Sequence, residues 1–151
     1  MDNDKQIAIL QTLATTLIDS INGYEEAAKN SENPSFERIF RENARERARV
    51  VEDLRSEIRR LGGDPPDDGS FMGKTHQTWL DLKAAVTGRD DQRIINSVEA
   101  GEDYLKEKFE AALDNADLAG EARQAVEKAY QSVRSGHDEV SRIKHRMEAM
   151  D

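Results

Sequence analysis

Four residues with charged or titratable side chains lie at apolar positions of four separate expected helices. They are Glu25, Arg47, Glu102 and His137. Charged groups rarely occupy such positions unless they are paired or bind something. Because helical bundles build metal and cofactor sites from inward-facing side chains, these residues predict a polar site in the middle of a four-helix bundle.

Two hypotheses for this site remain open. In the first, Glu25, Glu102 and His137, with Glu46 beside them, bind iron, manganese or zinc, since carboxylate and imidazole groups suit these metals. In the second, Glu25, Glu102 and His137 form a buried charge network with Arg47. This network fixes the register of the helices. A guanidinium opposes a metal cation and pairs well with carboxylates, so Arg47 favours the network.

The helices that position these residues follow from the spacing of apolar residues. Apolar side chains recur every three or four positions in long segments at about 4–30, 36–61, 90–116 and 118–150. Pro34 separates the first two helices, Ser35 is the expected N-cap of the second, and Gly62 with Gly63 ends it. Because Gly120 weakens the start of the last helix, that helix could begin a few residues later.

The composition predicts an all-α protein with a single domain over residues 1–151. Charged residues make up 35%, hydrophobic residues 36% and aromatic residues only 5%, a mixture that favours helix over strand. The net charge of −9 disfavours binding to nucleic acid and to anionic membranes. Acidic residues near the N-terminus and the lack of a long apolar stretch predict a cytoplasmic protein.

The link between the second and third long helices decides the topology. It has roughly 28 residues, whereas neighbouring helices of a bundle need only about 2 to 8. It is long enough to cross the bundle, and a short helix is expected in it at about 71–87. The prediction is therefore a ferritin-like four-helix bundle of two antiparallel hairpins joined by a long crossover. The alternative is a simple up-down-up-down bundle with a helical flap.

The chain resembles a family of uncharacterised bacterial ferritin-like four-helix-bundle proteins. The resemblance covers nearly the whole chain and rests on LGGDPPDDGS, HQTWLDLK, EAGEDYLKEKFEAAL, and SGHDEV with Arg142. It implies the ferritin-like bundle and points to Glu102, His137 and Asp138 as residues of interest. It implies no settled activity, because a fold does not define a function.

The sequence contains no glycine-rich phosphate loop and no nucleophile elbow, two of the common catalytic motifs. Ferritin-like di-metal sites use a Glu-x-x-His pair on two helices, but Arg47 and Arg134 stand where two of those ligands belong. We therefore expect a non-catalytic stress-type or interaction protein, a homodimer with an unidentified protein partner. The alternative is a metal carrier or metal-dependent oxidoreductase.

Overall fold

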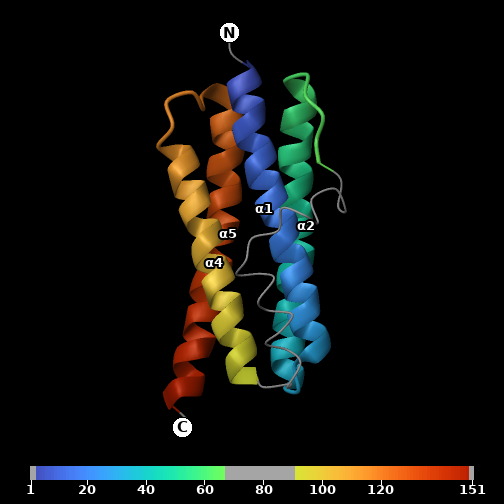
Figure 1. Ribbon diagram of the computed structural model, residues 1–151, viewed down its shortest axis with the longest axis vertical. Coiled ribbons are helices and arrows are strands. Elements are labelled where there is room, and N and C mark those ends of the chain that lie inside the picture. Colours follow the sequence, from blue (N-terminus) through green and yellow to red (C-terminus); the bar gives the residue numbers. More distant parts are fainter. Residues whose placement is uncertain (1–2, 67–90, 150–151) are drawn as a thin grey trace.

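Long α-helices make up most of the protein. The computed structural model describes residues 3–66 and 91–149 (Figure 1). Within these residues lie four helices, α1 (Asn3–Asn30), α2 (Pro34–Arg60), α4 (Asp91–Leu113) and α5 (Gly120–Ala149). The predicted all-helical bundle is therefore confirmed for this part of the chain. The short helix expected at about 71–87 lies outside the described residues.

The ends of α2 are fixed by local hydrogen bonds. At its start, the side chain of Asn33 accepts a hydrogen bond from the amide of Ser35 at 2.8 Å, with Pro34 in the first turn. The N-cap is thus Asn33, and the expectation of Ser35 was wrong by two positions. At its end, Gly62 has a φ of 93°, and the amide of Gly63 bonds the carbonyl of Ile58 at 2.9 Å. This is a Schellman motif, in which glycine adopts the left-handed conformation that other residues avoid.

Contacts between helix ends give the direction of each helix. The Asp91 carboxylate at the start of α4 accepts hydrogen bonds from the amides of Glu32 and Asn33 just before α2, at 3.1 and 3.2 Å. Arg60 at the end of α2 pairs with Glu121 at the start of α5, at 3.2 Å. Helices α2 and α4 therefore run in the same direction, and α5 runs opposite to both (Figure 1).

Each helix packs beside two others. The adjacent pairs are α1 with α2, α2 with α5, α5 with α4, and α4 with α1. Consequently α2 and α4 occupy diagonally opposite corners of the bundle, as do α1 and α5 (Figure 1). Only side chains that cross the bundle interior can join α2 to α4.

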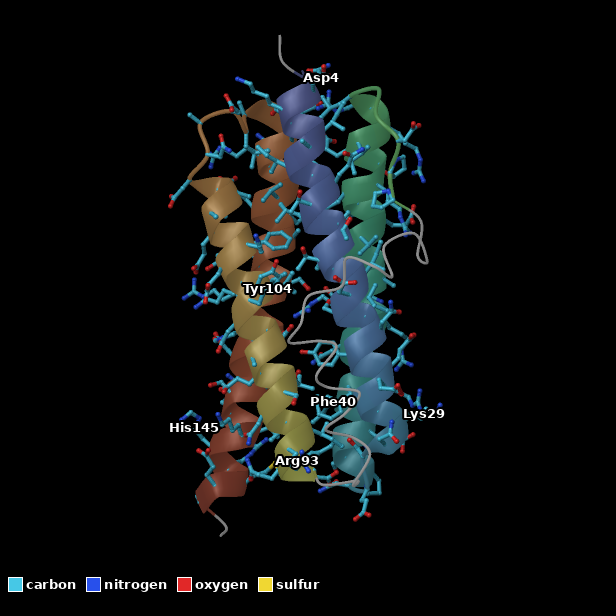
Figure 2. The ribbon with its side chains drawn as sticks, in the orientation of Figure 1. Asp4, Lys29, Phe40, Arg93, Tyr104 and His145 are labelled. Atoms are coloured by element: carbon cyan, nitrogen blue, oxygen red, sulfur yellow. The ribbon has the colours of Figure 1, made fainter. Side chains whose placement is uncertain are left out.

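The core consists of two apolar clusters, one in each half of the bundle. One contains Leu10, Leu17 and Phe109, and the other contains Phe40 and Ile95. Figure 2 shows Phe40 inside the lower half of the bundle, with Lys29 and His145 on its outside. The polar groups described next lie where the two clusters meet. None of the helices in the described segments combines the length and apolar character needed to cross a lipid bilayer.

Candidate functional site: a buried arginine–glutamate pair

Arg47 of α2 and Glu102 of α4 form an ion pair across the bundle diagonal. Nη1 of Arg47 donates to Oε1 of Glu102 at 2.8 Å, and Nη2 donates to Oε2 at 2.5 Å. Arg47 is 1% exposed and Glu102 is 0% exposed. Two parallel hydrogen bonds to one carboxylate are the strongest arrangement that a guanidinium makes. The pair therefore holds together two helices that do not pack side by side.

Two residues of α1 complete the surroundings of the guanidinium. Nη1 of Arg47 also donates to Oγ of Ser20 at 3.1 Å, and the Ser20 hydroxyl in turn donates to the carbonyl of Leu17 at 2.7 Å. The guanidinium carbon lies 5.5 Å from the centre of the Tyr24 ring, within the range of a cation–π interaction. Burial alone lowers the pKa of Arg47, but the Glu102 carboxylate and the nearby Tyr24 outweigh it, so the pKa lies above its ordinary value.

Gly136 of α5 provides the fourth side of the site. A Cβ atom at this position would lie 2.6 Å from Nη2 of Arg47 and 3.1 Å from Oε2 of Glu102. Real Cβ atoms do not approach other atoms as closely as the first distance. The ion pair therefore occupies space that opens because position 136 has no side chain, and all four described helices contribute to the site.

Tyr24 is the second titratable group inside the site. Its ring is fully buried and packs on Phe40, with ring centres 5.9 Å apart. Burial raises the pKa of Tyr24 well above its usual value, and the negative charge of Glu102 raises it further. Tyr24 therefore remains a neutral phenol at physiological pH.

The structure does not bring Glu25 into this site. Its side chain is exposed and lines a groove between α1 and α2 together with Val51 and Arg55. The expectation that Glu25 belongs to a buried network was therefore wrong. The buried stripe of α1 advances by alternating steps of three and four residues, through Leu17, Ser20 and Tyr24, and Glu25 is one position away from it.

His137 lies at the edge of the bundle, and its imidazole contacts two aspartates rather than Glu102. Its Nε2 is 2.6 Å from Oδ1 of Asp103 on α4, and its Nδ1 is 3.3 Å from Oδ1 of Asp138. The side chain is 17% exposed. Of the four residues predicted to meet, the structure thus joins only Arg47 and Glu102, whereas His137 links α5 to α4 separately.

Glu46 lies beside the site, on the solvent side of α2. Its carboxylate accepts a hydrogen bond from Oγ of Ser132 on α5 at 2.9 Å and also pairs with Arg49. The Ser132 hydroxyl lowers the pKa of Glu46 more than the partial burial of the group raises it, and Arg49 lowers it further. Glu46 is therefore an ionised surface group with partners of its own.

The donor set as it stands does not fit a metal centre. Both oxygens of Glu102 are bonded to Arg47, so a metal ion would have to displace a bidentate partner. Within residues 3–66 and 91–149, no three His, Asp or Glu side chains are grouped so that they could hold one ion. What the arrangement can do chemically is fix the relative position of four helices through one charged pair.

The sequence interpretation missed Ser20, Tyr24 and Gly136. Ser20 and Tyr24 are four residues apart and therefore share one face of a helix. Gly136 lies in the middle of a long helix, where glycine costs about 1 kcal/mol relative to alanine. Such a glycine is a signal for a close approach by a neighbouring group, but it does not say which group.

The fold and the site thus define an all-helical bundle with a buried ion pair at its centre. The sequence matches a family described as a domain of unknown function, DUF2383, over residues 5–115. The chain belongs to this family, and the match includes all of α1, except its first residues, together with α2 and α4. No curated protein matches the sequence. The family description assigns no activity.

Proposed function

We propose that this protein is a non-catalytic ferritin-like bundle, a stress-type or interaction protein in which an ion pair stands where related bundles hold metal. The observation that carries the proposal is the bidentate bond between Arg47 and Glu102. It occupies both oxygens of the only glutamate that is buried within the described residues. In this view the central site maintains the shape of the bundle, and the function lies on its outer surface.

The burial of the pair supports a structural role. A general acid or base has to come within hydrogen-bonding reach of its substrate. The side chain of Glu102 is 0% exposed and that of Arg47 is 2% exposed, and Tyr24 packs beside them with no exposed surface. A substrate has no path to the carboxylate unless the helices separate.

The direction of the helices supports the ferritin-like part of the proposal. Because α2 and α4 start at the same end of the bundle, the end of α2 and the start of α4 lie at opposite ends of it. Two antiparallel hairpins joined by a crossover require this separation. We further propose one domain, a cytoplasmic location and a homodimer. Light scattering on the purified chain tests the last point, and a monomeric mass contradicts it.

The competing hypothesis is a metal-binding protein or metal-dependent oxidoreductase. Since Glu25 is exposed, Glu46, Glu102 and His137 are the predicted ligands left to hold iron, manganese or zinc. This hypothesis requires Arg47 to turn away and His137 to leave Asp103. Elemental mass spectrometry separates the two, after expression with each metal added. We expect far less than one metal ion per chain.

The experiment includes two variants that remove predicted metal ligands, Glu102→Ala and His137→Ala. The matched control is Glu107→Gln, at an exposed position of α4, the helix that carries Glu102. A stoichiometric amount of metal that is lost in the first two variants and kept in the third would overturn the proposal.

A further inference from the structure

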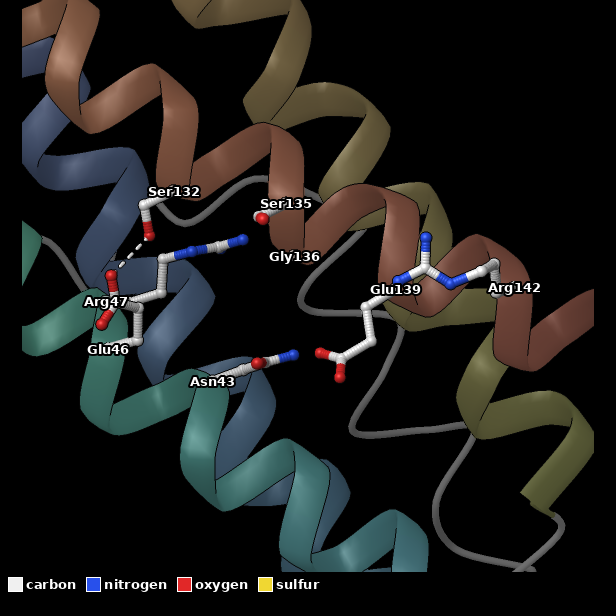
Figure 3. A pocket seen from close by; sticks show the side chains of 8 residues that line it. All are labelled: Asn43, Glu46, Arg47, Ser132, Ser135, Gly136, Glu139 and Arg142. Carbon is white, nitrogen blue, oxygen red and sulfur yellow. Dashed lines mark hydrogen bonds between the residues drawn. The ribbon is translucent and has the colours of Figure 1, made fainter.

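A pocket of about 330 Å³ lies between α2 and α5 and reaches the Arg47 side chain of the buried ion pair. Arg47 lies at its floor, Asn43 and Glu46 line it from α2, and Glu139 and Arg142 line it from α5 (Figure 3). Its volume is at the lower end of the range for small-molecule sites, about 300 to 1,000 Å³. The structural role of the ion pair does not use this pocket.

The floor of the pocket carries unused hydrogen-bond donors. A guanidinium has five N–H groups, and described residues accept from three of those of Arg47, two at Nη1 and one at Nη2. The remaining two, on Nε and Nη2, lie on the same side of the planar group and form its second bidentate edge. No residue of the described segments accepts a hydrogen bond from this edge. Gly136 borders Nη2 and has no side chain that could accept a hydrogen bond from this edge.

A second observation points to a missing acceptor at the same place. Nδ2 of Asn43 is buried near the Tyr24 hydroxyl, whose pKa the Asn43 side chain lowers, but it makes no hydrogen bond of normal geometry to a described residue. Buried polar atoms of native proteins are nearly always paired. In Figure 3 the amide end of Asn43 points into the pocket, toward the carboxylate of Glu139. An acceptor in the pocket, such as a carboxylate, would serve both Asn43 and Arg47.

The charges around the pocket define what else the ligand has to carry. The charge of Arg47 is balanced by Glu102. Glu46 is balanced in the same way by Arg49, so the rim that remains has the carboxylate of Glu139 and the guanidinium of Arg142. In this balanced pocket a simple anion would add an uncompensated negative charge near Glu139 and Glu46, and like charges placed together cost several kcal/mol. A simple cation would leave the second edge of Arg47 unused.

We propose that this pocket binds a small zwitterion, an amino acid whose carboxylate lies on the Nε and Nη2 edge of Arg47 and whose ammonium group lies at Glu139. The carboxylate receives the planar, two-point recognition for which a guanidinium is suited. The ammonium group pairs with Glu139, so the ligand adds no net charge to the pocket. This site goes beyond the proposed structural role of the ion pair, and its failure would leave that role untouched.

The probes are glycine, β-alanine and 4-aminobutyrate, which differ only in the separation of their two charges. Titration of isotope-labelled protein, followed by the amide signal of Gly136 and the Nε signal of Arg47, measures each dissociation constant. We expect at least one probe to bind with a dissociation constant below about 1 mM. Butyrate and butylamine, which each lack one of the charges, are expected to bind at least about tenfold more weakly.

Two variants locate the ammonium group. Glu139→Gln is expected to weaken binding of the best probe about tenfold, whereas Glu148→Gln, at an exposed position of the same helix, leaves it unchanged. The proposal is overturned if no probe binds at about 10 mM, if butyrate or butylamine binds as tightly as the best zwitterion, or if Glu139→Gln has no effect.

Discussion

Gly136 and Arg47 are in direct contact, and the contact is possible only because residue 136 is glycine. A Cβ atom there would lie 2.6 Å from Nη2 of Arg47. The guanidinium cannot move aside freely, since it is held by Glu102 at two points and by Ser20 at a third. A helix that would otherwise favour alanine at this position therefore needs glycine to accommodate the ion pair.

Gly136→Ala is expected to lower the free energy of unfolding. Alanine gains about 1 kcal/mol of helix propensity, but crowding a well-packed interior costs typically about 1 to 3 kcal/mol. We expect a net loss of about 1 kcal/mol in urea unfolding. The adjacent exposed substitution Ser135→Ala is the control, with a change within about 0.5 kcal/mol. A Gly136→Ala protein that is more stable than the parent would contradict the close packing.

Glu102→Gln is expected to destabilise the fold by about 3 to 5 kcal/mol. Glutamine has nearly the same shape as glutamate but no charge, so the Arg47 guanidinium would remain buried without its counterion. Urea unfolding of the variant measures the loss, and Glu107→Gln on the exposed face of α4 is the control. A midpoint equal to that of the parent would show that the pair contributes little to stability.

Replacement of both partners is expected to cost much less than loss of one. A buried ion pair can often be exchanged for apolar residues of similar volume without loss of stability. Arg47→Met combined with Glu102→Met should therefore unfold at a higher urea concentration than Glu102→Gln alone. If the double variant is the weaker of the two, packing around the pair matters more than its charge.

Much of the fold could be predicted from the sequence because the helices are regular and their ends have strong local signals. Pro34 and the two glycines at 62 and 63 interrupt the apolar periodicity, and the structure ends or begins helices next to them. Gly120 was expected to weaken the start of the last helix, and α5 begins at that residue. The third long helix ends at Leu113, three residues earlier than predicted.

The site could be predicted only in part, because small errors in helical phase change which side chain is buried. Arg47 and Glu102 are flanked by buried apolar residues three and four positions away, so their burial was clear. On α1 the polar Ser20 interrupts the apolar stripe and conceals its true course. An apolar stripe extended past Ser20 from the spacing alone lies one residue too far along the helix, and it includes Glu25 in place of Tyr24. Which carboxylate His137 would face depends on the relative rotation of two helices, and sequence spacing carries no information on that.

Tyr24 is expected to make the protein sensitive to alkaline pH. Its pKa in the folded protein lies well above the usual value, because of burial and the charge of Glu102. Below about pH 10 both states keep the proton, so this contribution to stability is fully present. Above that pH the unfolded chain releases the proton and the folded protein retains it. The free energy of unfolding should then fall by about 1.4 kcal/mol per pH unit from this group.

Tyr24→Phe removes this titration and should flatten the decline of stability between about pH 9 and 11. The comparison is urea unfolding at several pH values for the parent, Tyr24→Phe and the less buried Tyr104→Phe. An equal decline in the parent and Tyr24→Phe would show that Tyr24 ionises in the folded protein as readily as in the unfolded chain.

Ser132→Ala is expected to raise the pKa of Glu46 toward its ordinary value. The Ser132 hydroxyl donates a hydrogen bond to the Glu46 carboxylate at 2.9 Å, and this bond is the largest cause of the lowered pKa. A pKa lowered by folding stabilises the folded state above the unfolded pKa, and the contribution disappears as the pH falls through the folded value. Because the Glu46 side chain is 44% exposed, solvent screening keeps this contribution small. The direct measurement is the titration of the Glu46 carboxyl carbon by NMR, with Ser135→Ala as the control on the same helix. If the Glu46 pKa is the same in Ser132→Ala and the parent, Arg49 rather than the bond between α2 and α5 keeps this carboxylate ionised.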